Sequence, residues 1–206
     1  GDLIGTDTFV NNEVELRKGS IYRCAEFGGF GVLDEINMAK NDAVSVLHAS
    51  LDYRRCIDVP GYDKIDLHDA ARFIGTMNYG YAGTKELNEA LVSRFLVIDM
   101  PPQNEETLEY IFRRKFPEIK ENALRQWIGL FMDLQTKAGN SEITTKSLDL
   151  RGMLGALKAV SCGLSPALAV RMGVVNKCFD VFEKEIVQDV VMTRIPESWT
   201  TGDVFQ

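Results

Sequence analysis

Phe30-Gly31-Val32-Leu33-Asp34-Glu35-Ile36 is a short apolar run that ends in two adjacent carboxylates. The run predicts a buried β-strand whose large apolar side chains lie in the core. Because ligands of α/β sheets bind at the carboxyl ends of the strands, Asp34 and Glu35 would lie where a metal-bound phosphate is handled. In a second interpretation, Asp34 or Asn37 caps a helix that begins near Met38. These residues alone leave both interpretations open.

The two carboxylates suit the hydrolysis of a nucleoside triphosphate. Asp34 can hold Mg²⁺, directly or through its water shell. Glu35 can orient a water molecule for in-line attack on the γ-phosphate. The pair therefore offers both the metal ligand and the base that this reaction needs.

Composition limits the classes of protein to consider. The 206 residues suffice for one large core or two modest domains, and 45% hydrophobic with 26% charged residues is typical of a soluble protein. No run of about eighteen apolar residues predicts a membrane span, and no leader pattern occurs, so we expect a cytoplasmic location. A net charge of −7 argues against general nucleic-acid binding. Four separated cysteines without a Cys-x-x-Cys pair argue against a zinc site.

The first half of the chain has the pattern of an α/β domain. Residues 14–19 alternate apolar and charged side chains, as one strand of an exposed hairpin does. We expect helices over residues 20–27, 38–51 and 86–92, a second hairpin between residues 56–59 and 64–67, and core strands over residues 72–78 and 95–100. The last run is apolar almost throughout, which is typical of strands buried on both faces of a parallel sheet.

The character of the sequence changes at Pro101-Pro102. Beyond this point apolar residues recur at helical spacing, and capping residues such as Asn104 and Ser165 precede them. We expect helices that begin at Asn104 and Ser165, and others over residues 123–138, 149–163 and 179–192. The chain is therefore predicted to comprise an α/β part, residues 1–101, and an all-helical part, residues 102–206.

Four short motifs follow one another along the chain: Val32-Leu33-Asp34-Glu35, Gly75-Thr76-Met77-Asn78, Leu91-Val92-Ser93-Arg94-Phe95 and Leu150-Arg151-Gly152. Together they resemble an AAA+ ATPase, and the details resemble its MoxR and dynein-related branch. The first motif, with the following Ile36-Asn37-Met38-Ala39, is similar to the Walker B strand, the second to sensor 1 and the third to the arginine-finger segment. The resemblance covers nearly the whole chain. It implies a partial parallel-sheet core of the P-loop NTPase type, followed by a helical lid domain.

The resemblance assigns a role to each of five residues. Asp34 would coordinate Mg²⁺ and Glu35 would be the water-orienting base, while Asn78 would place the water and sense the γ-phosphate of ATP. Arg94 would reach the site of a neighbouring subunit, and Arg151 in the lid would act as sensor 2 in its own subunit. Three simpler interpretations stay open: Asn78 as a strand-ending turn residue, Arg94 as a surface ion-pair partner, and Arg151 as the partner of an acidic helix start.

The predicted hairpins and one lid segment extend the resemblance. Residues 14–21 resemble the insert before Walker B, and residues 56–67 resemble the hairpin before sensor 1. Both features are commonly directed at the pore of the ring or at its substrate. Residues 163–169 resemble the lid of the NorQ, CbbQ and gas-vesicle-type members.

One motif of the family does not occur. The Gly-x-x-x-x-Gly-Lys-Ser/Thr loop, whose backbone amides and lysine cradle the phosphates, is absent from the 206 residues. Since the family places this loop ahead of the Walker B region, we expect that the chain lacks the first strand, the P-loop and the first helix. The alternative is a natural protein without a P-loop.

The resemblance implies a subunit of a homo-hexameric ring that couples ATP hydrolysis to the remodelling or maturation of another protein or complex, with ATP and Mg²⁺ as cofactors. In this branch, a partner with a von Willebrand A domain often presents the client. Two alternatives stay open: a non-hydrolysing structural or interaction module of AAA+ origin, and a nucleotide-driven motor of a restriction or ribosome-maturation system. We expect the 206 residues alone to be inactive.

Overall fold

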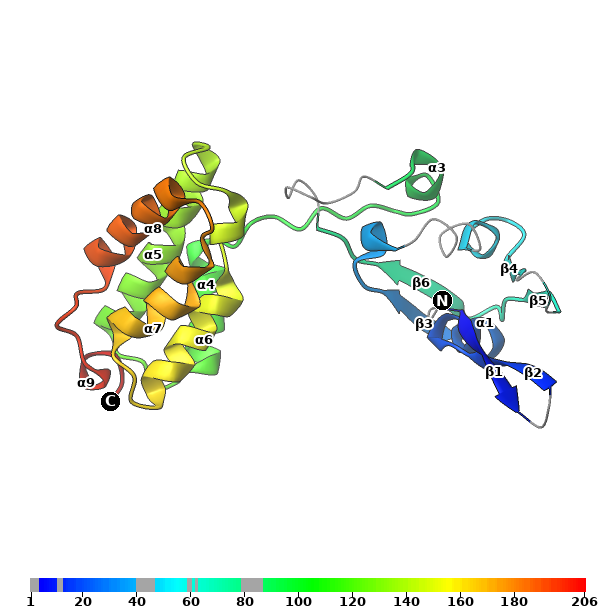
Figure 1. The fold of residues 1–206 in the computed structure, drawn as a ribbon, viewed down its shortest axis with the longest axis horizontal. Coiled ribbons are helices and arrows are strands. Elements are labelled where there is room, and N and C mark those ends of the chain that lie inside the picture. Colours follow the sequence, from blue (N-terminus) through cyan, green and yellow to red (C-terminus); the bar gives the residue numbers. More distant parts are fainter. Residues whose placement is uncertain (1–3, 11–12, 40–46, 59–60, 62, 79–86) are drawn as a thin grey trace. The chain divides into compact units, whose positions relative to one another are not determined.

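The computed structural model describes residues 4–10, 13–39, 47–58, 61, 63–78 and 87–206. The chain divides into two compact units, unit 1 (Gly1–Asp99) and unit 2 (Met100–Gln206) (Figure 1). Each unit has its own cluster of buried apolar side chains. Within the described ranges, no helix has both the length and the apolar character needed to cross a membrane.

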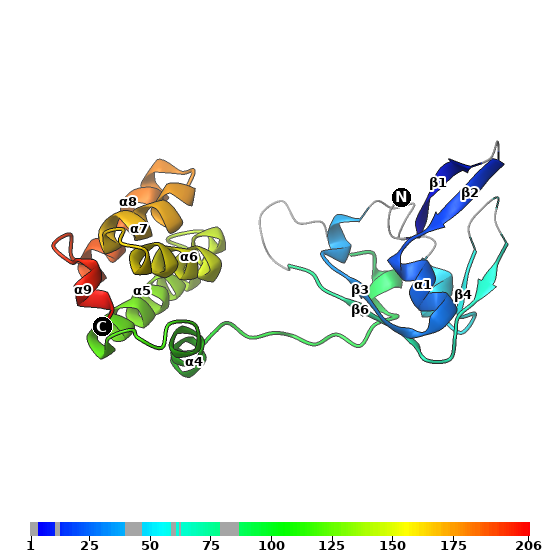
Figure 2. The same cartoon turned by 90° about the horizontal axis from the view of Figure 1, so that it is seen from below.

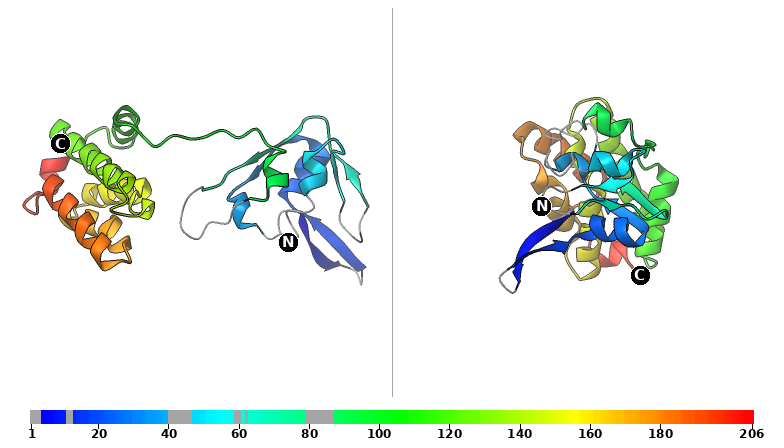
Figure 3. Two further views of the ribbon diagram at one scale, coloured as in Figure 1. Left: turned by 90° about the horizontal axis from the view of Figure 1, so that it is seen from above. Right: turned by 90° about the vertical axis from the view of Figure 1, so that its right-hand side faces the viewer.

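Unit 1 begins with an antiparallel hairpin of β1 (Gly5–Val10) and β2 (Glu13–Lys18), paired from Gly5↔Lys18 to Val10↔Glu13. As its alternating pattern predicts, β2 is one strand of a hairpin, which stands away from the rest of the unit (Figure 3). Helix α1 (Ser20–Phe27) follows over the residues that the sequence predicts. Ile21 and Ala25, one helical turn apart, are fully buried and form its packing face.

The core of unit 1 contains a parallel pair of strands, β3 (Gly29–Leu33) and β6 (Ala71–Gly75) (Figures 1 and 2). The pair runs in register from Gly29↔Ala71 to Leu33↔Gly75, so the predicted α/β class is confirmed. Helix α1 covers one face of this pair. There a Cβ on Gly31 would lie 2.8 Å from the Phe73 ring and 3.2 Å from Ile21, and Leu33 is buried.

The other face of the pair is open among the described residues, which corrects one prediction. Phe30 and Val32 of β3 are 74% and 57% exposed, and Ile74 of β6 is 47% exposed. The prediction that the large apolar side chains of β3 all lie in the core was therefore wrong for Phe30 and Val32. A strand sends successive side chains to opposite faces, and no described element covers the face that these two residues occupy.

The apolar run of residues 95–100 gives a second correction. The sequence predicts a strand buried on both faces, but the structure has no strand over these residues. Leu96, Ile98 and Met100 are 97%, 81% and 86% exposed. A strand forms only when a neighbouring strand bonds to its backbone, and none of the described strands pairs with this run.

The remaining elements of unit 1 are short. As predicted, β4 (Cys56–Ile57) pairs antiparallel with β5 (Ile65–Asp66). Helix α3 (Glu89–Val92) is shorter than the helix expected over residues 86–92. A 3-10 turn, η1 (Ile36–Met38), stands where a longer helix was expected to begin, and residues 47–51 are helical. Residues 40–46, which the same prediction includes, lie outside the described ranges.

Unit 2 is helical, with one isolated β-bridge between Ile119 and Phe205 in addition to its helices and 3-10 turns. The helical class predicted beyond Pro102 is confirmed. The helices are α4 (Glu105–Lys115), α5 (Glu121–Gly139), α6 (Leu150–Ser161), α7 (Pro166–Gly173), α8 (Val181–Arg194) and α9 (Thr201–Val204), with 3-10 turns η2 (Thr145–Ser147) and η3 (Val175–Lys177).

Local capping fixes where several of these helices begin. The Asn104 side chain accepts a hydrogen bond of 2.9 Å from the Thr107 amide at the start of α4. The Asp149 side chain accepts one of 2.8 Å from the Gly152 amide at the start of α6. Pro166 opens α7, where a missing amide hydrogen costs nothing. These three helices begin where the sequence predicts, although the Ser165 side chain makes no capping hydrogen bond.

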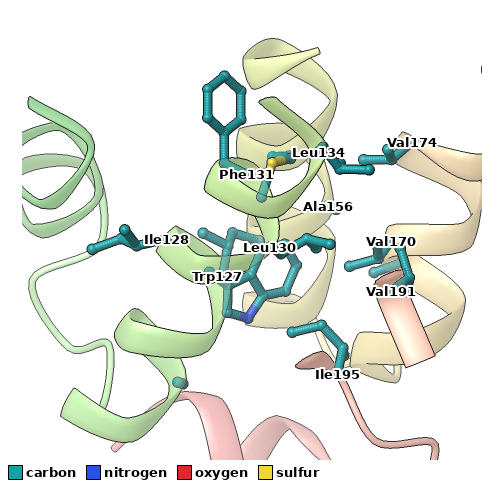
Figure 4. Close-up of a cluster of buried hydrophobic side chains, with 14 of the residues drawn as sticks. Trp127, Ile128, Leu130, Phe131, Leu134, Ala156, Val170, Val174, Val191 and Ile195 are labelled. Carbon is teal, nitrogen blue, oxygen red and sulfur yellow. The ribbon is translucent and has the colours of Figure 1, made fainter. Parts of the chain in front are cut away.

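The core of unit 2 forms around one face of α5 (Figure 4). Trp127, Leu130 and Leu134 on α5 are fully buried. Figure 4 shows them among side chains from three other helices, namely Ala156 of α6, Val170 of α7, and Val191 of α8. Arg194, the last residue of α8, also donates two hydrogen bonds, of 2.7 and 3.1 Å, to the Asp133 carboxylate on α5.

A close contact between α6 and α7 predicts a large loss of stability on a small substitution. A Cβ on Gly152 would overlap the Gly173 carbonyl oxygen, so Gly152→Ala must push two helix backbones apart. Such overpacking costs about 1–3 kcal/mol. The control is Gly155→Ala on the same helix, where a Cβ meets nothing within 4 Å and the gain in helix propensity stabilises by up to about 1 kcal/mol.

The measurement is urea unfolding followed by tryptophan fluorescence. Both tryptophans, Trp127 and Trp199, belong to unit 2, so the signal reports on that unit alone. We expect the midpoint to fall for Gly152→Ala and to stay or rise for Gly155→Ala. Equal midpoints for the two variants would show that α6 and α7 are not packed as described.

Candidate functional site

The carboxyl ends of β3 and β6 meet in unit 1. The last paired residues are Leu33 and Gly75, so Asp34 and Thr76 leave the sheet side by side. The Thr76 amide donates to the Leu33 carbonyl at 2.9 Å, and the Ile36 amide donates to the Thr76 carbonyl at 3.0 Å. These backbone bonds extend the parallel pairing into the two segments that carry the predicted Walker B and sensor 1 residues.

The Thr76 hydroxyl joins the two carboxylate residues to the second strand. It donates a hydrogen bond of 2.5 Å to Asp34 Oδ1 and accepts one of 3.2 Å from the Glu35 amide. The sequence did not single out Thr76. Thr76 stands two residues before Asn78, but this position indicates a contact with Asp34 only when the register of β3 against β6 is known.

Glu35 has an unusual backbone conformation. Its φ of 50° and ψ of 48° place it in the left-handed region, which a residue with a side chain adopts at some cost in free energy. The cost is offset here by the bond of its amide to Thr76 and by the turn η1 that follows. Both side chains of the pair, Asp34 and Glu35, are exposed to solvent.

Asn37 links the same turn to Asn78. Its side chain is only 5% exposed, and its Nδ2 donates a hydrogen bond of 3.4 Å to the Asn78 carbonyl oxygen. Its Oδ1 is buried with no hydrogen-bond partner. The Asn78 side chain is exposed. The structure therefore brings Asp34, Glu35 and Asn78 together, and Thr76 and Asn37 make the connections.

Arg94 lies against its own unit. Its Nη2 is 3.5 Å from Asp52 Oδ2, its Nη1 donates to the Ala90 carbonyl, and its Nε is buried without a partner. The side chain is 27% exposed. Asp52 is shared with Arg54, which binds it more closely, at 2.7 Å. In this structure Arg94 is therefore an ion-pair partner of Asp52, which is one of the two interpretations that the sequence leaves open.

Arg151 belongs to the other unit, in the first turn of α6, and is exposed. The acidic residue at the start of this helix, Asp149, forms its ion pair with Lys177, at 2.5 Å. Burial raises the pKa of the Asp149 carboxyl, but the Lys177 bond and the Gly152 amide together outweigh it and hold the pKa below its usual value. The cation paired with Asp149 is therefore Lys177, and Arg151 contributes only through its backbone amide.

The donor set at the strand ends fits a magnesium ion that is held mainly by its nucleotide. Mg²⁺ typically takes one or two carboxylates and completes its shell with phosphate oxygens and water. Asp34 supplies an exposed carboxylate at the end of a parallel strand. Within the described ranges, no group of three or more His, Cys, Asp or Glu could hold a metal ion unaided.

Comparison with known proteins finds a family model similar to unit 1. Residues 2–95 match the family model described as the AAA domain of the dynein-related subfamily. The chain is 30% identical over 196 residues to the uncharacterized protein YojN of Bacillus subtilis (strain 168), covering 93% of this chain and 64% of YojN. It is 27% identical over 199 residues to an uncharacterized protein of Staphylococcus aureus (strain NCTC 8325 / PS 47), covering 94% of this chain and 74% of that protein.

One solved structure similar to this chain is that of an ATPase candidate from Cytophaga hutchinsonii, with 19% sequence identity and a TM-score of 0.42 over 98% of this chain and 70% of that one. Of the curated relative YojN, the chain spans 64% of the length. The family match covers the hairpin β1–β2, the strands β3 and β6, and the Arg94 segment. Residues 2–95 of this chain are thus similar to the AAA domain of the dynein-related subfamily.

Proposed function

We propose that the intact protein is a Mg²⁺-dependent ATPase of the MoxR branch, which assembles into a hexameric ring and remodels or matures another protein or complex in the cytoplasm. The observation that carries the proposal is the bonding at the ends of β3 and β6, which groups Asp34, Glu35 and Asn78. Proteins of the AAA family generally bind ATP with Mg²⁺. The client, and a von Willebrand A domain partner that presents it, are part of the proposal.

Each residue of the group has a distinct task in this proposal. Asp34 holds the metal ion, which neutralises charge that develops on the phosphates when it is bound. Glu35 accepts a proton from the attacking water, and the Asn78 amide holds that water in place. Arg151 serves as sensor 2 from the lid, which unit 2 (Met100–Gln206) provides.

The phosphate cradle is proposed to come from protein outside these 206 residues. Two features of unit 1 support this: the face of the β3–β6 pair that no described element covers, and the exposed apolar run of residues 95–100. Parallel strands are usually covered on both faces, so both features fit a sheet that a further strand and helix complete. A P-loop strand followed by its helix would have the required form.

A non-hydrolysing module of AAA+ origin is the second candidate, and one observation favours it. Arg94 is bonded within its own unit to Asp52 and to Ala90, as a structural arginine would be. The two candidates differ in a direct test. An intact protein that releases phosphate from ATP only when Mg²⁺ is present supports the ATPase, whereas one that binds ATP without turnover supports the module.

The 206-residue chain itself should be nearly inert toward ATP. Without backbone amides and a lysine to hold the phosphates, the charges of Asp34 and Glu35 repel the nucleotide. We expect no hydrolysis above background. We also expect a dissociation constant for ATP above about 1 mM by titration calorimetry, because most of the binding free energy is lost with the phosphate contacts. The control is the intact protein under the same conditions. Tight binding by the 206-residue chain would show that the phosphates are held elsewhere.

A further inference from the structure

Two side chains outside the predicted catalytic set connect the ends of β3 and β6. The Thr76 hydroxyl makes two hydrogen bonds, to Asp34 Oδ1 at 2.5 Å and from the Glu35 amide at 3.2 Å. A hydroxyl can donate one hydrogen bond and accept others at the same time. A single atom on one strand therefore fixes a side chain and a backbone amide at the end of the other.

Asn37 makes the second connection, from η1 to Asn78. Asn37 is only 5% exposed, yet only its Nδ2 is bonded, and its Oδ1 has no hydrogen-bond partner. A buried amide with an open acceptor costs free energy that a leucine of similar size would not. Packing alone therefore does not explain an asparagine here, whereas its bond to the Asn78 main chain does.

We propose that Thr76 and Asn37 are positioning residues, which hold Asp34, Glu35 and Asn78 in one arrangement; this rests on the proposed ATPase function. Thr76 acts on the metal side, because it fixes the Asp34 carboxylate and the left-handed backbone of Glu35. Asn37 acts on the water side, through Asn78. Groups that orient metal ligands through hydrogen bonds typically change metal affinity or activity 10- to 100-fold when removed.

The first experiment needs no nucleotide and uses the 206-residue chain. Thr76→Val removes the hydroxyl at nearly constant volume, and Thr76→Ser keeps it. We expect the Glu35 amide to exchange its hydrogen about fivefold faster in Thr76→Val, which is the factor for one hydrogen bond of about 1 kcal/mol. The Ile36 and Thr76 amides are internal controls, because they bond to backbone carbonyls. If all three amides change together, the strand ends have loosened and the proposal fails.

The second experiment uses the intact protein and separates metal from nucleotide. We expect Thr76→Val to raise the Mg²⁺ concentration for half-maximal ATP hydrolysis and to lower kcat, each about 10-fold or more, with the KM for ATP unchanged. Thr76→Ser should restore both. Asn37→Leu should lower kcat without changing the Mg²⁺ requirement, because Asn78 is not a proposed metal ligand. A merely structural role would not divide the effects in this way.

Thr8→Val is the matched control. Thr8 Oγ1 also donates a hydrogen bond, to the Glu15 carbonyl at 3.1 Å, but it lies in the hairpin β1–β2. The Thr8→Val variant should have the kcat and the Mg²⁺ requirement of the wild type. Thermal unfolding verifies that every variant is folded. If the wild type hydrolyses ATP and Thr76→Val matches it in kcat and Mg²⁺ requirement, the positioning role alone is wrong. If the wild type hydrolyses no ATP, the proposed function fails, and this proposal fails with it.

Discussion

On the proposed function, Glu35→Gln in the intact protein should nearly abolish ATP hydrolysis while ATP binding and ring assembly persist. Glutamine keeps the size of the side chain and leaves Asp34 free to hold Mg²⁺, but it cannot accept a proton from the attacking water. Loss of a general base typically costs about 10²–10⁴ in rate. The bond from the Glu35 amide to Thr76 involves the backbone and is kept, so the turn should retain its shape.

The measurement is steady-state phosphate release at saturating ATP, beside equilibrium binding of ATP in the presence of Mg²⁺. Glu26→Gln is the matched control, because Glu26 is an acid of unit 1 that pairs with Lys18 at 2.7 Å and lies outside the strand ends. It should retain full turnover. A Glu35→Gln protein with turnover within about tenfold of the wild type would remove Glu35 from the role of general base.

Arg94→Ala should have an effect at least as large, if Arg94 serves the site of a neighbouring subunit. Arginine fingers in phosphoryl transfer are worth about 10³–10⁵ in rate, because they neutralise charge that spreads over the transferring phosphoryl group. The signature is recovery on mixing. A ring of Arg94→Ala and Glu35→Gln subunits contains some interfaces that combine an intact Glu35 with an intact Arg94, so part of the activity should return.

The contact between Arg94 and Asp52 sets a condition on this role. Arg54 holds both carboxylate oxygens of Asp52, with Nε donating to Oδ1 and Nη2 to Oδ2, and this bidentate contact together with the charge of Arg94 keeps the pKa of the Asp52 carboxyl well below its usual value. Because the pKa of Asp52 is lower in the folded protein than in the unfolded chain, the stabilisation by its ion pairs is fully present at pH values above the unfolded-state pKa. It is lost only as the pH falls through the folded-state pKa. Asp52 thus stays ionised at neutral pH, and a competing phosphate must draw Arg94 away while Arg54 remains.

Phosphate release against mixing ratio tests the prediction after subunit exchange has been verified. Arg54→Ala is the control, because it removes the same charge from the same Asp52 and has no place in the proposed reaction. Activity that stays at the level of the single variants at every ratio would assign Arg94 to the ion pair alone. Recovery would show that the arginine leaves Asp52 when a neighbouring site binds nucleotide.

The sequence alone determined the features that depend on neighbouring residues. Asn104, Asp149 and Pro166 mark helix starts in unit 2 because capping involves residues three or fewer positions apart. Helix α1 and both hairpins follow from periodicity and turn residues in the same way. The placement of two carboxylates directly after a strand is also local, since it needs only the order of residues along the chain.

Tertiary structure decided which side chains meet and which faces are covered. Thr76 lies 42 positions from Asp34 and reaches it only through the parallel register of β3 and β6, which no local pattern specifies. Phe30 is apolar and in a strand, as expected, yet its exposure depends on what covers that face. Arg94 finds Asp52 through the fold, and its motif gives no sign of that partner. Composition and spacing fix the chemistry available, whereas register and packing fix where each group can act, because burial and hydrogen bonding depend on residues distant in the chain.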